Sequence, residues 1–266
     1  MEQISEVLRK IRKESPILYY IAIINLIGAI VCIPGLLWDD RTLMGVNVWI
    51  KPIKFLISVG IYILTLGYLI TFYPFSKLKK NIIRNIVAWS LLLENTIVVT
   101  QAGRGVQSHY NMSTAIDGIL FGMMGILIAI NVTVMVFFVI ETIRLKLNVS
   151  KPMQWAILFA WIITVFGSWI GGQMIGQMAH NVGIVDGGPG LPLVNWSTVA
   201  GDIRVAHFFG LHGLQIIPLI ALIIQKNAKW SDSIKTMIVL GFASIYLIFI
   251  AAVFYQAMIG KPFIGV

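Results

Sequence analysis

The chain has 266 residues, of which 58% are hydrophobic and only 12% are charged, and its mean hydropathy is +0.87. Soluble domains are about half apolar and about a quarter charged, so this composition excludes a soluble globular protein and predicts a polytopic membrane protein. The single cysteine, Cys32, excludes a disulfide framework and a cysteine-type zinc site. The net charge of +9 does not indicate nucleic-acid binding, because the basic residues follow a membrane topology.

Residues 1–16 form a charged, amphipathic N-terminal segment, and residues 17–266 are predicted to form a single transmembrane domain. A spanning helix needs about 20 mainly apolar residues. Seven segments meet this requirement: 17–38, 53–74, 82–102, 114–141, 153–178, 203–225 and 235–258. The predicted fold is therefore an all-α, polytopic membrane helical bundle with seven transmembrane helices.

Basic residues mark the cytoplasmic side of membrane proteins. If the N-terminus is cytoplasmic, 14 of the 20 basic residues fall on the inner side: Arg9, Lys10, Arg12, Lys13, Lys77, Lys79, Lys80, Arg84, Arg144, Lys146, Lys151, Lys226, Lys229 and Lys235. The inner side then sums to 14 − 5 = +9 and the outer side to 6 − 6 = 0. This pattern predicts a cytoplasmic N-terminus and an extracytoplasmic C-terminus in the bacterial cytoplasmic (inner) membrane.

The third predicted helix, 82–102, holds the most informative single residue, Glu94. Glu94 lies about ten residues, or about 15 Å, below the outer end of the helix. An ionisable side chain at that depth is costly and indicates a functional site by default. Gln101 shares its helix face. Further polar residues gather at the outer ends of this helix and its neighbours: Lys54, Arg104, His109 and Asp117.

The fifth predicted helix, 153–178, carries two different faces near its outer end. Three polar residues repeat at helical spacing on one face: Gln173, Gln177 and His180. Gly172 and Gly176 form a GxxxG pattern on another face, which predicts tight packing against a neighbouring helix. The loop that follows, 179–202, is rich in glycine and proline, and we expect it to be a lid or a site wall.

The sixth predicted helix, 203–225, presents a polar face to the bundle interior. This face is formed by Arg204, His207 and Gln215, with His212 on its flank. Gly210 and Gly213 lie on the opposite side, where small residues allow a neighbouring helix to approach closely. Pro218 predicts a kink just below the polar face.

All four histidines map to the predicted outer side, which favours a histidine/carboxylate site. Imidazole and carboxylate are common ligands of zinc and iron, and helical bundles build metal sites from facing helices. The predicted metal ligands are His109, His180, His207 and His212, and the predicted acid–base groups are Glu94 and Asp117. The candidate cofactors are zinc, iron and haem b. The predicted substrate-binding residues are Lys54, Gln101, Arg104, Gln173, Gln177, Arg204 and Gln215.

We expect Glu94, His109, His207 and His212 to share one pocket open to the outer leaflet or periplasm, walled by residues 179–202. A one-sided site suits a metal-dependent hydrolase or an oxidoreductase that acts on a lipid, a quinone or a periplasmic small molecule. One alternative is a proton- or anion-coupled transporter, although there is no detectable inverted repeat and the inner half carries no comparable set of polar residues. The other is a non-catalytic complex subunit or receptor.

Several of these residues also admit a plain structural role. Membrane glutamines often form hydrogen bonds between helices, worth about 0.6 kcal/mol each. In this interpretation Arg204 forms an interface ion pair with Asp202, and Lys51 or Lys54 forms one with Asp39 or Asp40. The glycine-rich stretch 187–190 is a turn, because no strand precedes it and no lysine follows.

Four blocks carry a resemblance to a known group of proteins: "WIKPIKF" (49–55), "QAGRGVQSHYN" (101–111), "GDIRVAHFFGLHGLQIIPL" (201–219) and "QAMIGKPF" (256–263). They resemble a family of uncharacterised bacterial multi-pass inner-membrane proteins, and the resemblance implies no activity. A looser analogy is with the seven-helix zinc hydrolases, which combine three histidines with an aspartate. The present chain departs from that pattern, because its helix 203–225 carries HxxxxH instead of HxxxH and its last helix has no histidine.

Overall fold

The computed structural model describes residues 2–227 and 229–265. The chain divides into two compact units, Met1–Val134 and Met135–Val266, and the boundary falls inside one long helix. Within these described residues, seven helices are long and apolar enough to cross a membrane, which confirms the prediction of an all-α, multi-pass membrane protein.

The seven observed spans lie close to the predicted ones: Pro16–Trp38, Ile50–Phe72, Lys77–Gly103, Ala115–Arg144, Lys151–Gln177, Ile203–Gln225 and Asp232–Met258. The largest difference is at the third span, which was predicted to begin at 82 and begins at Lys77. Ser76 caps this helix by accepting a hydrogen bond from the backbone N–H of Lys79 at 3.2 Å, so the lysine-rich turn that hydropathy excluded is helical as well. The sidedness of the spans stays a prediction from the basic residues.

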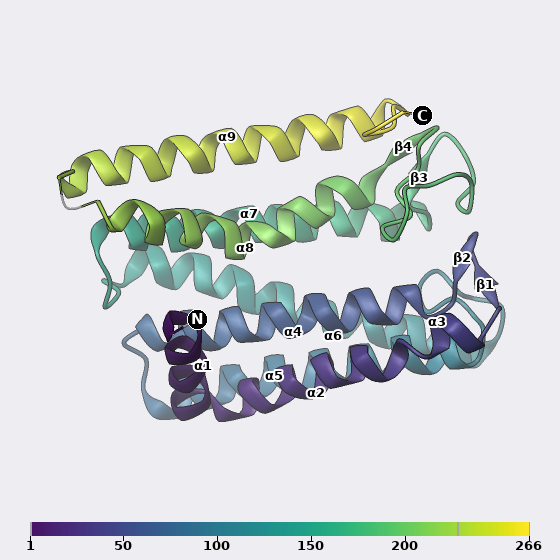
Figure 1. Cartoon of the computed structure of the whole chain (residues 1–266), viewed down its shortest axis with the longest axis horizontal. Coiled ribbons are helices and arrows are strands. Elements are labelled where there is room, and N and C mark those ends of the chain that lie inside the picture. Colours follow the sequence, from purple (N-terminus) through teal and green to yellow (C-terminus); the bar gives the residue numbers. More distant parts are fainter. Residues whose placement is uncertain (1, 228, 266) are drawn as a thin grey trace. The chain divides into compact units, whose positions relative to one another are not determined.

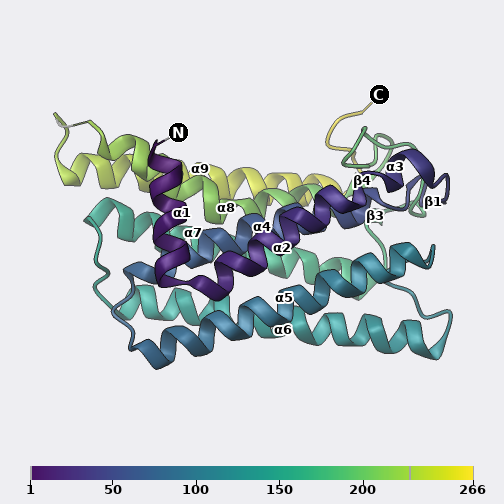
Figure 2. The ribbon, with the colours of Figure 1, turned by 60° about the horizontal axis from the view of Figure 1, so that its bottom comes forward.

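The first unit contains the N-terminal helices and one small hairpin (Figure 1). Its elements are α1 (Glu2–Glu14), α2 (Pro16–Cys32), α3 (Gly35–Trp38), β1 (Thr42–Leu43), β2 (Val46–Asn47), α4 (Ile50–Leu69), the 3-10 helix η1 (Ile70–Phe72), α5 (Lys77–Gly103) and α6 (Ala115–Arg144) as far as Val134. α2, α4 and α5 pack against one another around buried Leu18, Ile63 and Leu66. α1 runs across these helices instead of alongside them (Figure 2).

The hairpin of β1 and β2 was not predicted, because its turn lacks the usual asparagine or aspartate before glycine. Met44 and Gly45 both have positive φ angles, 53° and 78°, as a two-residue hairpin turn of this hand requires. Next to the hairpin, the Asp39 carboxylate accepts hydrogen bonds from Arg41 at 2.6 and 2.8 Å and from the indole N–H of Trp49 at 2.8 Å. The Arg41 guanidinium, helped by Trp49, holds the pKa of Asp39 well below its usual range.

The second unit contains the remainder of α6, three long helices and a strand pair. Its elements are α7 (Lys151–Gln177), β3 (Asn181–Val182), β4 (Gly201–Asp202), α8 (Ile203–Gln225) and α9 (Asp232–Met258). Ser150, Asp202 and Ser231 cap α7, α8 and α9 by accepting a backbone N–H with their side chains. The three helices pack in pairs, and the rings of Phe138 and Trp161 stack at 4.8 Å to hold the end of α6 on α7.

α7 and α8 make their closest approach at a pair of glycines. A Cβ added to Gly210 would lie 2.5 Å from the Cα of Gly167, and one added to Gly213 would lie 2.5 Å from Ile163. The predicted glycine side of helix 203–225 is therefore its packing surface. The predicted packing role of Gly172 and Gly176 stays a prediction, because a Cβ at either position meets no described atom within 4 Å and no described helix of the second unit packs there.

The long loop between α7 and α8 is closed at its base. β3 pairs with β4 in antiparallel register, with Asn181 opposite Asp202. Gly201 lies so close to α9 that an added Cβ would be 1.9 Å from the carbonyl oxygen of Ala257. Beyond this point α8 is continuous to Gln225 and contains Pro218 among its buried residues.

Candidate functional site

Glu94 lies in the core of the first unit. Only 2% of its surface is exposed, and neither carboxylate oxygen has a hydrogen-bond partner among the residues that the structure describes. An ionised carboxylate near the middle of a membrane costs roughly 3 kcal/mol on insertion scales unless it is compensated. The carboxyl group of Glu94 is thus an unusual feature of this chain, as the sequence predicted from its depth.

Lys51 and His109 lie at the end of the same unit where α4 begins and α5 ends. The ammonium nitrogen of Lys51 is 3.2 Å from Nδ1 of His109 and 5.6 Å from the centre of the Phe55 ring. Lys51 also acts electrostatically on Glu94. An ammonium group only donates hydrogen bonds, so the His109 ring accepts at Nδ1 and carries its proton on Nε2. Two of the predicted site residues, Glu94 and His109, are therefore linked through Lys51.

The interior of the first unit also contains a set of amides that sequence reasoning missed. Asn25 donates to the carbonyl oxygen of Ile21 at 2.7 Å and accepts from Asn95 at 2.5 Å. Both amide groups use their N–H donors in these two hydrogen bonds. The side-chain oxygen of Asn95 is left over: it is buried and has no partner among the described residues.

A second amide repeats this arrangement beside Glu94. Asn131 donates to the carbonyl oxygen of Leu127 and to the hydroxyl of Ser90, both at 2.8 Å. Its own side-chain oxygen is buried and has no partner within the described chain. Ser90 precedes Glu94 by one helical turn on α5, so the hydrogen bond between Asn131 and Ser90 lies within one turn of Glu94 along that helix.

Asp117, the second predicted acid–base group, is in the opposite situation. It is 2% exposed and accepts hydrogen bonds from Gln101 at 2.9 Å, from Arg104 at 2.6 Å and from Thr114 at 2.7 Å. Arg104 also donates to Gln101. These predicted substrate-binding residues are brought together, but they hold one another and fasten the end of α5 to the start of α6.

In the second unit, His180 pairs with an aspartate of the long loop. Its Nδ1 donates to the Asp186 carboxylate at 2.7 Å, and the backbone N–H groups of His180 and Asn181 donate to the same carboxylate at 2.9 and 2.8 Å. Burial opposes the ionisation of Asp186, but the hydrogen bonds from His180 and Asn181 outweigh it and lower the pKa of Asp186 to about 2. His180 thus orders the base of the loop.

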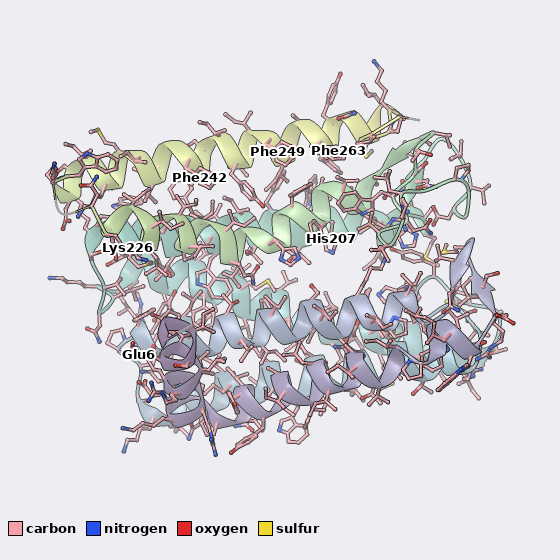
Figure 3. The ribbon with its side chains drawn as sticks, in the orientation of Figure 1. Glu6, His207, Lys226, Phe242, Phe249 and Phe263 are labelled. Atoms are coloured by element: carbon pink, nitrogen blue, oxygen red, sulfur yellow. The ribbon has the colours of Figure 1, made fainter. Side chains whose placement is uncertain are left out.

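His207 and His212 lie on α8. Nδ1 of His207 is 2.8 Å from the carbonyl oxygen of Gly167, and its ring occupies the space that a Cβ at Gly171 would need (Figure 3). His212 is 3.2 Å from Gln215 and packs against Phe208 with a centroid distance of 4.4 Å. His207 therefore bridges α8 to α7, whereas His212 bonds within its own helix.

Two of the remaining predicted substrate-binding residues, Arg204 and Gln177, have local hydrogen-bond partners. Arg204 donates to Asp202 at 2.6 Å and to the carbonyl oxygen of Asn195, as in the structural interpretation of this pair. Gln177 donates to the carbonyl oxygens of Ala179 and Asn181. Gln173 lies on α7 and Lys54 on the second turn of α4.

Aromatic rings cover the first two turns of α8. Trp196 of the long loop packs against Phe209 and Phe263, and Phe209 also packs against Phe249 with a ring-centroid distance of 5.0 Å. The loop that was predicted to wall the site is therefore held on α8 by an aromatic cluster.

The predicted metal ligands are divided between the two units, with His109 in the first and His180, His207 and His212 in the second. Among residues 2–227 and 229–265, no group of three or more histidine, cysteine, aspartate or glutamate side chains is arranged to hold a metal ion. The single pocket shared by Glu94, His109, His207 and His212 stays a prediction. Comparison of the chain with protein-family models, with curated proteins and with solved structures finds no match in any of the three.

Proposed function

We propose that this chain is a multi-pass protein of the bacterial cytoplasmic membrane that binds and relays protons at Glu94, as the first unit of a proton-coupled transporter would. The observation that carries this proposal is the Glu94 carboxyl group, which is buried and has no hydrogen-bond partner for either oxygen within the described chain. Intramembrane carboxyl groups of this kind are typical of proton relays.

The contrast with Asp117 explains why Glu94 is the proton-binding group. Gln101, Arg104 and Thr114 all donate to Asp117, so its negative charge is held by fixed donors. Glu94 has no such donors, and a carboxyl group in an apolar interior is stable when it is neutral. Only a buried carboxyl group without fixed donors, such as that of Glu94, gains and loses a proton as its surroundings change.

The neighbours of Glu94 offer a route toward one end of the unit. Lys51 acts on Glu94 and contacts His109, which precedes α6 in the connection at the end of α5. Imidazole is the side chain that exchanges protons most readily near neutral pH. The unpartnered oxygens of Asn95 and Asn131 supply acceptors in the middle of the unit.

The metal and haem hypotheses remain as an alternative proposal. In their favour, Nδ1 of His207 and of His180 each contacts an acceptor, a backbone carbonyl and a carboxylate respectively, as in many histidines that ligate a metal through Nε2. The donor set around them is incomplete in the part of the chain that the structure describes. The substrates proposed for this alternative are a lipid, a quinone or a periplasmic small molecule.

Glu94→Gln tests the proton-relay proposal. Glutamine keeps the size and polarity of the side chain but cannot carry the proton. We expect proton flux into proteoliposomes under an imposed membrane potential to fall by about a hundredfold, in line with the contribution of a positioned proton-transfer group. Infrared spectra should also lose the carbonyl band of a buried protonated carboxyl group.

Asp40→Asn is the matched control, because it makes the same acid-to-amide change at an exposed position. It should leave both the flux and the infrared band unchanged. Equal flux in the wild type and Glu94→Gln, with the carboxyl band still present, would overturn the proposal. A Soret band or near-equimolar zinc in the purified wild type, together with no flux, would favour the metal or haem alternative instead.

A further inference from the structure

α1 lies across the end of α4 and is fastened there by several contacts. Ile11 is 1% exposed and sits over Gly67, where an added Cβ would be 2.9 Å from it. The hydroxyl of Ser15 donates to the carbonyl oxygen of Gly67 at 2.9 Å. The ammonium group of Lys10 lies over the Phe72 ring at 4.7 Å. Figures 1 and 2 both show α1 crossing the direction of α2 and α4.

An amphipathic helix that crosses spanning helices at their end lies along the membrane surface. The residues of α1 that face away from α4 include three exposed basic ones: Arg9, Arg12 and Lys13. The first turn of α5 adds Lys77, Lys79 and Lys80 at the same end of the unit, since α5 follows directly after η1. This end of the first unit therefore carries a concentrated positive charge.

Arg84 is a buried cation beneath this surface. It is 6% exposed, and its Nε is buried without a hydrogen-bond partner among the described residues. Lys80, one turn earlier, and Glu14 of α1 both act on it electrostatically, and Lys10 acts on Lys80. Glu14 therefore acts on both Arg84 and Lys80, and Lys10 adds a further positive charge beside Lys80. A buried guanidinium that keeps an unsatisfied donor requires an anionic acceptor.

The position of Arg84 along α5 identifies the source of that anion. Arg84 is seven residues after Lys77, or about 10 Å along the helix axis. Arginine side chains in a helix lean toward its N-terminus and extend their charged ends to the membrane interface. The guanidinium therefore lies at the level of lipid phosphates, and a phosphate matches its planar fork of donors.

We propose that α1 and the first three turns of α5 form a binding site for the phosphate of an anionic phospholipid, with Arg84 as the buried ligand and Lys80 and Lys10 at the rim. This site is independent of the proton relay at Glu94. The phosphate of the lipid headgroup supplies the negatively charged acceptor for the Arg84 guanidinium. α1 covers the bound headgroup from the aqueous side.

Thermal unfolding of the purified full-length protein in mild detergent tests this site. Added phosphatidylglycerol should raise the Tm of the wild type in a saturable manner, whereas phosphatidylcholine and inorganic phosphate at equal concentration should not. Arg84→Met should abolish the rise. Arg12→Gln, which removes the same charge from an exposed position of α1, should keep it.

A second measurement compares the Tm of Arg84→Met with that of the wild type, first without lipid and then with it. Replacing a buried guanidinium whose Nε has no hydrogen-bond partner among the described residues by an apolar side chain relieves a cost, so in lipid-free detergent Arg84→Met should be at least as stable as the wild type. With phosphatidylglycerol it should be less stable, so the order of the two Tm values reverses. If Arg84→Met does not fold, Lys80→Gln should still reduce the lipid-induced rise more than Arg12→Gln does.

Three results would overturn the proposal. The first is an equal rise in Tm for the wild type and Arg84→Met. The second is an equal loss of the rise in Arg12→Gln, which would indicate general surface attraction. The third is an equal rise with inorganic phosphate, which would show that the site takes a soluble anion and not a lipid.

Discussion

Asp186 shows how one carboxylate can order a loop of more than 20 residues. It accepts from the ring of His180 and from two backbone N–H groups at the base of the loop. Asp186→Asn replaces one acceptor oxygen by a donor and removes the ion pair. We expect the variant to lose about 1–3 kcal/mol of stability, because backbone N–H groups are left without a good acceptor. Thermal unfolding together with limited proteolysis of the loop would measure this.

The pH dependence of that loss follows from the pKa of Asp186, which is about 2 in the folded protein against an ordinary 3.8. As the pH falls, the unfolded chain binds the proton first. The stabilisation is therefore complete above about pH 4 and is lost as the pH falls through about 2. Asp186→Asn should not show this change. Asp232→Asn, at an exposed position at the start of α9, is the matched control and should behave as the wild type.

Individual residues differed in how far the sequence could predict their roles. Glu94 was identified because a charge inside an apolar run is visible without a structure. Asn25, Asn95 and Asn131 were missed, because an asparagine in a span indicates nothing until its partner on another helix is known. Asp117 was assigned to catalysis, although Gln101, Arg104 and Thr114 all donate to it.

At the scale of elements, the α7–α8 crossing depends on the absence of side chains at one point. Gly210→Ala would place a methyl group 2.5 Å from the backbone of Gly167, which cannot yield without separating the helices. We expect a loss of about 1–3 kcal/mol, the usual cost of overpacking, measured as a fall in Tm.

Gly172→Ala is the matched control on α7, because an added Cβ there meets no described atom within 4 Å. It should be neutral or slightly stabilising, since alanine favours helix over glycine by about 1 kcal/mol. Equal destabilisation by the two substitutions would contradict the crossing.

The sequence predicted the spans well, because length and hydropathy determine them. The choice of contact glycine depends on the rotation of α7 relative to α8, which no local pattern specifies.

For the molecule as a whole, the distribution of basic residues predicts the sidedness. A reporter fused after Val266, which itself lies outside the described residues, should be active only in the extracytoplasmic compartment. Fusions after Lys146, in the connection between α6 and α7, should be active only in the cytoplasm. Cytoplasmic activity of the C-terminal fusion would reverse the side assigned to every residue.

The predicted site was the part of the structure that the sequence could predict least, because its residues are far apart along the chain. The helical faces and depths of His207 and Glu94 could be estimated from spacing, but a pocket that they share with His109 depends on the arrangement of all seven helices. The chain forms two compact units, and the predicted residues are distributed over both. The single domain of residues 17–266 stays a prediction.

The boundary inside α6 also has a consequence for how the protein is made. The ribosome synthesises the chain from its N-terminus, and early segments begin to fold before later ones have been made. The contacts of the first unit are complete once residue 134 has entered the membrane, when α7, α8 and α9 have not yet been synthesised. The second half of α6 is then the first piece of the next unit to be inserted. Biogenesis of this protein can therefore proceed in two successive steps. The first half of α6 completes the first unit, and its second half begins the second unit.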